Sequence, residues 1–205
     1  DTGELLWQFD ARGPINGTQA FDGDFTFVAG CDEPVLYVVD TRDGTEHARV
    51  PLEVLLIGTP ALVDGILYFG TSDGSVVALD WKAQTTIWTY ETRQGRELHS
   101  APAVTEDRVL IVGRDKALYC LDRKTGKEQW VFTTRGGSDN SPVVIGDRVY
   151  FGTGDKFAYG VSLADGREIW KFSAGVAFNE ASPAIAQERM VLCTEGPAGR
   201  ILCFG

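Results

Sequence analysis

Polar side chains that could bind a ligand recur in this sequence at a nearly constant spacing. Asn16, His99, Asp139 and Glu180 precede a proline (or a glutamine in its place) by three residues, at intervals of 40 to 42 residues with Ile57 between the first two. Imidazole and carboxylate groups ligate cations, and amides and carboxylates bind sugar hydroxyls. We expect any small polar ligand to bind at the following six residues: Asn16, His99, Asp139, Asn140, Asn179 and Glu180. The alternative is a hydrated polar rim.

Other chemically active residues favour structural roles. His47 and His99 are the only histidines, and the sequence contains no G-x-S-x-G, H-E-x-x-H or phosphate-binding glycine loop. The cysteines have no C-x-x-C spacing, so we expect buried free thiols that act as small hydrophobic side chains and bind no metal, with Cys193 and Cys203 diagonal across a hairpin. Aspartates at 32, 73, 115 and 155 could form a cation-binding ring, but aspartate is also a common turn residue, which we favour here.

A repeat of about 41 residues must position these side chains. Two independent markers keep the same period, a tryptophan and a proline, and both have one exception, Ala48 and Gln19. The tryptophans are Trp7, Trp88, Trp130 and Trp170, and the prolines are Pro60, Pro102, Pro142 and Pro183. The approximate repeats are 1–40, 41–80, 81–122, 123–163 and 164–205, within a single domain over 1–205.

Each repeat contains four short runs with strand character. The clearest are 59–64, 66–71, 75–80 and 85–90, linked by turns such as Asp64-Gly65 and Ser72-Asp73-Gly74. Four antiparallel strands per repeat of this length are typical of a propeller blade. The sequence therefore predicts an all-β, five-bladed β-propeller with four-stranded antiparallel blades.

The ends of the sequence predict how the ring closes. Residues 2–9 read as a fourth strand and residues 200–205 as a third, so together they would complete one blade and remove exposed sheet edges. The alternative is that the five repeats are a segment of a longer propeller. The four marker tryptophans are expected to pack between blades, with room made by a small residue on the third strand. These small positions are Val38, Ala78, Cys120, Gly160 and Cys203.

The pattern A-x-D-x-x-T-G-x-x-x-W resembles the tryptophan-docking motif of pyrroloquinoline-quinone-type propeller repeats. Its best matches are Cys120, Asp122, Thr125, Gly126 and Trp130. The resemblance implies either quinone- and calcium-dependent dehydrogenases or non-catalytic propellers of outer-membrane assembly, both eight-bladed. The dehydrogenases carry adjacent cysteines over the cofactor, which this sequence lacks. The chain is therefore more similar to the non-catalytic members, for which no cofactor is expected and a periplasmic or extracellular place is implied.

Composition limits the partners. The formal net charge of −10 disfavours binding to nucleic acid or to anionic lipid. The sequence has no apolar run of transmembrane length, so we expect no insertion into a membrane. We expect a non-catalytic scaffold for an unidentified protein partner. A small-ligand or carbohydrate-binding module is the alternative, and a fragment of a quinone-dependent oxidoreductase is third.

Overall fold

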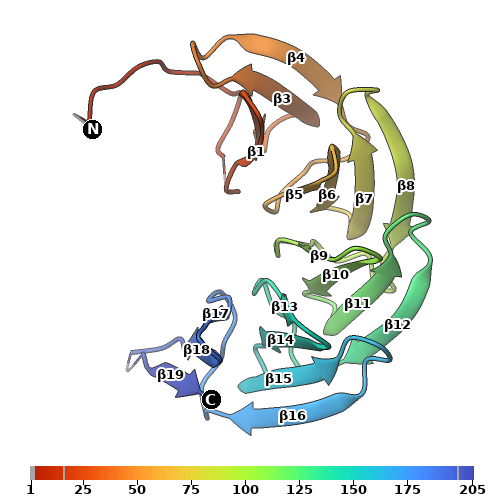
Figure 1. Cartoon of the computed structure of the whole chain (residues 1–205), viewed down its shortest axis with the longest axis vertical. Coiled ribbons are helices and arrows are strands. Elements are labelled where there is room, and N and C mark those ends of the chain that lie inside the picture. Colours follow the sequence, from red (N-terminus) through yellow and green to blue (C-terminus); the bar gives the residue numbers. More distant parts are fainter. Residues whose placement is uncertain (1–2, 16, 198) are drawn as a thin grey trace.

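The described residues of the protein form five antiparallel sheets arranged side by side in an arc (Figure 1). The computed structural model describes residues 3–15, 17–197 and 199–205. Each sheet contains consecutive strands, and we name the sheets blade one (β1–β4), blade two (β5–β8), blade three (β9–β12), blade four (β13–β16) and blade five (β17–β19). Within the described part of the chain, no helix has the length and apolar character to cross a membrane. The predicted all-β class is confirmed.

The strands have the same order in every blade, from the concave side of the arc outward (Figure 1). The innermost strands are β1 (Ala20–Asp22), β5 (Ala61–Val63), β9 (Ala103–Val104), β13 (Val143–Ile145) and β17 (Ala184–Ala186). The second strands are β2 (Phe25–Ala29), β6 (Ile66–Gly70), β10 (Arg108–Gly113), β14 (Arg148–Gly152) and β18 (Arg189–Cys193). The third are β3 (Val35–Asp40), β7 (Ser75–Asp80), β11 (Ala117–Asp122), β15 (Phe157–Ser162) and β19 (Ile201–Phe204). The outer strands are β4 (Glu46–Pro51), β8 (Thr85–Glu91), β12 (Glu128–Thr133) and β16 (Glu168–Ser173).

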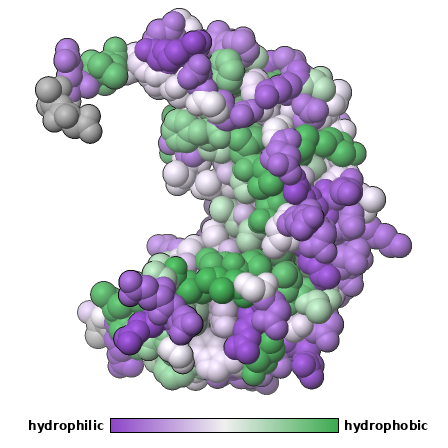
Figure 2. All heavy atoms as spheres, in the orientation of Figure 1, coloured by the Kyte–Doolittle hydropathy of each residue, from purple (hydrophilic) through white to green (hydrophobic). Residues whose placement is uncertain are grey.

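The core lies in the seams between neighbouring blades. Because side chains alternate across a sheet, a central strand contributes to two seams. In β11, Tyr119 and Leu121 face blade two, whereas Leu118 and Cys120 face blade four. All four are 0% exposed, which explains why the third strands are apolar almost throughout. Figure 2 shows hydrophobic residues along the concave side and hydrophilic residues over much of the convex side.

Tryptophan side chains of the outer strands cross the seams to the next blade. The indole Nε1 of Trp88 donates to the carbonyl oxygen of Arg123 at 2.9 Å, and that of Trp130 to Leu163 at 3.0 Å. The small residues predicted to make room stand directly opposite, because Ala78 pairs with Trp88 and Cys120 with Trp130. The pairing register shifts immediately after each of these small residues. The repeat therefore fixes a bulge as well as a packing slot.

A glycine lies beneath each of these indoles. Gly126 has φ +69°, and a Cβ on it would lie 2.6 Å from the Trp88 ring. Gly166 has φ +70° and holds the same place under Trp130, where a Cβ would lie 2.5 Å from the ring. Each of these turns therefore requires glycine for two reasons, a left-handed backbone and the close approach of a ring.

The seam between blades one and two is built differently. Its outer strand carries Ala48 in place of tryptophan, and the left-handed turn position holds Gln84, with φ 54°, in place of glycine. Trp81 enters this seam from the opposite side: its Nε1 donates to Asp22 Oδ2 at 3.1 Å, and its ring lies 5.1 Å from that of Phe27. Trp81 is 4% exposed and belongs to the same apolar cluster as Ala48.

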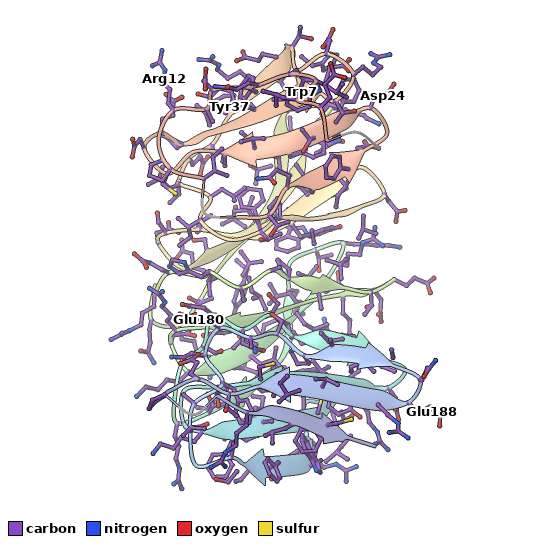
Figure 3. All side chains as sticks on the ribbon, turned by 90° about the vertical axis from the view of Figure 1, so that its left-hand side faces the viewer. Trp7, Arg12, Asp24, Tyr37, Glu180 and Glu188 are labelled. Atoms are coloured by element: carbon purple, nitrogen blue, oxygen red, sulfur yellow. The ribbon has the colours of Figure 1, made fainter. Side chains whose placement is uncertain are left out.

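The predicted closure of the ring is not confirmed. Blade five has three strands, with β19 at its edge, and residues 3–10 are not paired with it. Instead, Trp7 packs on blade one, where its Nε1 donates to the carbonyl oxygen of Thr41 at 2.8 Å and Phe9 lies 5.4 Å from Tyr37. Figure 3, which faces the opening of the arc, shows Trp7 and Tyr37 near the top and Glu180 and Glu188 in the lower half. The described ends are therefore apart because the arc of five blades spans less than a full circle.

The predicted repeat boundaries fall after the third strand of each blade. The repeat 41–80, for example, begins just after β3 ends at Asp40 and ends with β7 at Asp80. A sequence repeat therefore contains the outer strand of one blade and the three inner strands of the next. The carbonyls that accept from the seam tryptophans lie at these boundaries, because Arg123 is the first residue of its repeat and Leu163 the last.

Candidate functional site

The residues predicted to bind a ligand lie in the loops that enter the innermost strands. Asn16 lies outside the described residues. Ile57, His99, Asp139 and Glu180 each precede an innermost strand by a few residues, and these strands line the concave side of the arc (Figure 1). We call His99, Asp139, Asn140, Asn179 and Glu180 the channel-mouth set.

Two members of the set, His99 and Asp139, are joined through an ionic network. His99 Nε2 lies 2.9 Å from Glu97 Oε2, which also accepts from Arg114 Nη1 at 2.8 Å. Arg114 then reaches Asp139 with both ends of its fork, from Nε to Oδ1 at 2.8 Å and from Nη2 to Oδ2 at 2.7 Å. This two-point geometry fixes the orientation of the guanidinium as well as its charge. The network links the inner loops of blades three and four.

The charges of this network influence one another. The hydrogen bond with His99 and the positive charge of Arg114 lower the pKa of Glu97 below its usual value. The carboxylate of Asp139 raises the pKa of Arg114. Glu97 and Arg114 were not predicted from the sequence, since neither stands at the repeated position. Arg114 lies in the turn between β10 and β11, next to Asp115, and the equivalent residues are Ser72 and Gly154.

The other members of the set make separate contacts. Asn140 is 0% exposed: its Nδ2 donates to the carbonyl oxygen of Ala181, and its Oδ1 accepts from the backbone N–H of Gly152 at 3.1 Å. Its amide therefore links blades four and five. The carbonyl oxygen of Asn179 accepts from the backbone N–H of Asp139 at 3.0 Å. Glu180 is exposed, and its backbone N–H donates to Glu195 Oε1 at 2.8 Å.

Hydroxyl groups next to the marker prolines connect successive blades. The backbone N–H of Thr18 donates to Thr59 Oγ1 at 2.9 Å, that of Ala101 to Ser141 Oγ at 2.9 Å, and that of Ser141 to Ser182 Oγ at 3.0 Å. Each of these bonds joins the same position of neighbouring blades. The small hydroxyl residues beside Pro60, Pro142 and Pro183 could have indicated these bonds, because the same residue type recurs there with the period of the repeat.

The turn aspartates act as hydrogen-bond acceptors for their own blades. Asp73 Oδ1 accepts from Thr71 Oγ1 at 2.6 Å and from the backbone N–H of Ser75 at 3.1 Å. Asp155 Oδ2 accepts from Tyr159 at 2.8 Å, and Asp115 Oδ2 accepts from Tyr119. In blade one Glu33, rather than the predicted Asp32, accepts from the corresponding Tyr37, because that turn is one residue longer. The turn interpretation is confirmed for Asp73 and Asp155.

The cysteines occupy separate environments. Cys120 is buried, and burial raises the pKa of its thiol to about 11. Cys193 pairs with Ile201 and Cys203 with Val191, so these two cysteines are diagonal to each other, as predicted. The expected burial is wrong for both, because they are exposed in the three-stranded blade five. In the described ranges, no group of three or more His, Cys, Asp or Glu is arranged to hold a metal ion.

Comparison with known proteins agrees with this architecture. The fold defines a β-propeller repeat protein, and a family model described as "Outer membrane protein assembly factor BamB" matches residues 1–101 and 84–203. The chain belongs to this PQQ_2 family of pyrroloquinoline-quinone-type repeats. The crystal structure of BamB from Moraxella catarrhalis superposes with a TM-score of 0.80 at 20% identity, covering 98% of this chain and 64% of that one.

Curated relatives include both proteins named as enzymes and an assembly factor. The dehydrogenase subunit of the quinone alcohol dehydrogenase of Komagataeibacter europaeus is 27% identical over 156 residues, 69% of this chain and 17% of the relative. The outer membrane protein assembly factor BamB of Shewanella oneidensis is 25% identical over 148 residues, 63% of this chain and 36% of the relative. The chain thus spans about a sixth of the first relative and about a third of the second.

Proposed function

We propose that this chain is a non-catalytic scaffold that binds a protein partner in the assembly of outer-membrane proteins. The observation that carries the proposal is the match of the assembly-factor family model along almost the whole chain. The words "outer membrane" in the description of that family favour a periplasmic location.

The side chains of the channel-mouth set support a binding role more than a catalytic one. The carboxylates of Asp139 and Glu97 are engaged by Arg114, and the Asn140 amide is bound to backbone groups on both sides. A general acid or base needs a proton-transfer partner within reach and a pKa near the working pH. Charges fixed in this way instead present a rigid polar surface to a partner.

In-cell cross-linking tests the scaffold proposal. A photoreactive amino acid at Glu180, exposed in a loop that enters an innermost strand, should give a discrete adduct with an outer-membrane assembly protein when the chain is exported to the periplasm. Lys127 is the matched control, because antiparallel order places the turn between β11 and β12 on the opposite face from that loop. Equal labelling of many proteins from both positions would contradict the proposal.

A second candidate is binding of a small polar ligand at the channel mouth. The network of His99, Glu97, Arg114 and Asp139 favours it, because these groups hydrogen-bond readily to sugar hydroxyls. A crystal soaked with a monosaccharide mixture should give difference density beside His99 and Asp139. Density only elsewhere, or unchanged binding in Asp139→Ala with Glu180→Ala, would remove this candidate.

A quinone-dependent oxidoreductase is the third candidate, from the dehydrogenase relatives. Pyrroloquinoline quinone and calcium added to the chain should give no dye-linked oxidation of an alcohol or aldose. Reproducible turnover that a chelator abolishes would replace the scaffold proposal with this one.

A further inference from the structure

A cleft of about 480 Å³ opens on the side of blade two that faces blade one. It follows the outer strand β8 and is bordered by residues 51–54, which are the end of β4 and the segment after it. Its apolar lining includes Leu52, Phe69 and Val77, and its polar lining includes Thr71, Asp73 and Thr89. The volume is within the range of sites that bind small molecules or single side chains of a partner.

In three other blades the residue equivalent to Val77 is a tyrosine that fills this space. The third residue of each third strand is Tyr37, Val77, Tyr119 or Tyr159, in blades one to four. Each tyrosine hydroxyl donates to an acid of the preceding turn, Tyr119 to Asp115 and Tyr159 to Asp155. Blade two retains the acid, Asp73, and lacks the tyrosine.

The preceding blade adds a second ring in the two seams that follow. Tyr90 lies 5.7 Å from Tyr119, and Phe132 lies 5.3 Å from Tyr159. At the corresponding place blade one carries Val50, which pairs with Leu36 as Tyr90 pairs with Val76. The first seam therefore lacks both rings, and the cleft lies where they would stand.

The charge of the cleft is one-sided. Asp73, Glu53 and Glu91 line it, and no lysine or arginine is among its described lining residues. Burial acts to raise the pKa of Asp73, but its bonds with Thr71 and Ser75 outweigh burial and lower that pKa, so the carboxylate is ionised at neutral pH. An ionised carboxylate is a stronger acceptor than a neutral one.

We infer that this cleft binds a tyrosine side chain that stands next to a basic residue in a partner polypeptide. The ring would occupy the volume left by Val77 and Val50, and the hydroxyl would donate to Asp73, as Tyr159 donates to Asp155. The basic neighbour would meet Glu53 or Glu91. The polypeptide nature of the occupant rests on the proposed scaffold function. The cleft itself does not, and the experiment below examines the cleft alone.

Tyramine is the probe, because it combines a phenol with an ammonium group. Titrated into the 205-residue chain, it should shift the backbone amide NMR signals of Val77, Ser75 and Thr89 with a dissociation constant near 1 mM, a value on the order of that expected for so small a ligand. Phenethylamine lacks the hydroxyl and should bind at least about fivefold more weakly. 3-(4-Hydroxyphenyl)propionate carries a carboxylate in place of the ammonium and should bind more weakly still, because the cleft is acidic.

Val77→Tyr is the decisive variant, because it supplies the missing ring and hydroxyl from within and leaves Asp73 in place. It should reduce tyramine affinity by at least about tenfold while the remaining amide signals stay dispersed. Val144→Tyr, on β13 of blade four and outside the cleft, is the control and should leave the affinity unchanged. Unchanged affinity in Val77→Tyr, or shifts confined to other blades, would overturn the inference. If tyramine binds but no protein adduct forms at Glu180, the inference about the cleft stands and the scaffold proposal is contradicted.

Discussion

The first seam of the arc and the two that follow it differ in the aromatic residues that pack between the blades and in the turn residue beneath them. Between blades two and three, Trp88 lies over Gly126, and Tyr90 packs against Tyr119. Between blades one and two the outer strand supplies Ala48 and Val50. Blade two supplies Gln84 and Val77 at the places of the glycine and the tyrosine, and adds Trp81.

This difference indicates that the seam residues change together. Gln84 takes the left-handed conformation of Gly126 without a clash because the residue that would lie over it, Ala48, has no ring. Trp81 stands at the position of Arg123, whose carbonyl accepts the indole of Trp88. In the first seam this residue contributes its own indole to the preceding blade, so a tryptophan fills the seam from the other side.

The largest expected effect is the loss of a seam tryptophan. Trp88→Ala should destabilise the chain by about 3–5 kcal/mol, because a large side chain that is 8% exposed is removed and a cavity remains. Ile87→Ala, on the same strand at 49% exposure, is the control and should cost less than about 1 kcal/mol. Urea melts would measure both. Similar losses in the free energy of unfolding of the two variants would mean that the Trp88 indole does not stabilise the seam.

A smaller effect is expected when a Cβ is added beneath the ring. Gly126→Ala places a methyl group 2.6 Å from the Trp88 ring, which should cost about 1–3 kcal/mol by overpacking. A left-handed backbone at φ +69° adds about 1 kcal/mol.

Gln84→Ala is the matched control, since Gln84 has nearly the same backbone with φ 54° and no ring above it. It should change the free energy of unfolding by less than about 0.5 kcal/mol. Thermal melts in which Gly126→Ala and Gln84→Ala lower the melting temperature equally would contradict the distinction between the seams.

Rebuilding the first seam in the manner of the second tests whether its residues are coupled. Ala48→Trp alone should destabilise by about 1–3 kcal/mol, because Trp81 already fills the apolar cluster to which Ala48 belongs. The triple variant Ala48→Trp, Trp81→Arg and Gln84→Gly should recover most of that loss. If the triple variant loses more free energy of unfolding than the three single variants do in sum, the two arrangements are not alternatives.

The smallest effect is expected at the channel mouth. Because the pKa of Glu97 is lowered in the folded chain, its contribution to stability is present above the unfolded value of about 4.3 and is lost as the pH falls through the folded value. Glu97→Gln should remove that part of the acid dependence. The cost at neutral pH should be below about 1 kcal/mol, because Arg114 and Glu97 are 43% and 50% exposed.

Stability measured by urea melts across the acid range would check this prediction, with Asp107→Asn as the control. Asp107 is 69% exposed and lies outside the network. An acid dependence that is the same in Glu97→Gln and in the unmodified chain would contradict the assigned role of Glu97.

Local information in the sequence determined the blades. The strands, the turns and the small residue opposite each tryptophan follow from alternation, turn chemistry and a period kept over five copies. The repeated position also located the loops that contain His99 and Asp139. These features depend on contacts between residues close in sequence or at the same place in neighbouring repeats, and a single sequence displays both.

Only the tertiary structure decided the network, the first seam and the closure. Arg114 joins Glu97, in the loop before β9, to Asp139, in the loop before β13, and neither Arg114 nor Glu97 recurs in other blades, so no repeated pattern reveals them. Both polar atoms of the Asn140 side-chain amide are hydrogen-bonded to backbone groups, one in blade four and one in the loop that enters blade five. Whether an arc of five blades closes depends on the angle added at each seam. That angle is set by how the side chains pack, whereas the number of strands is set by the repeat.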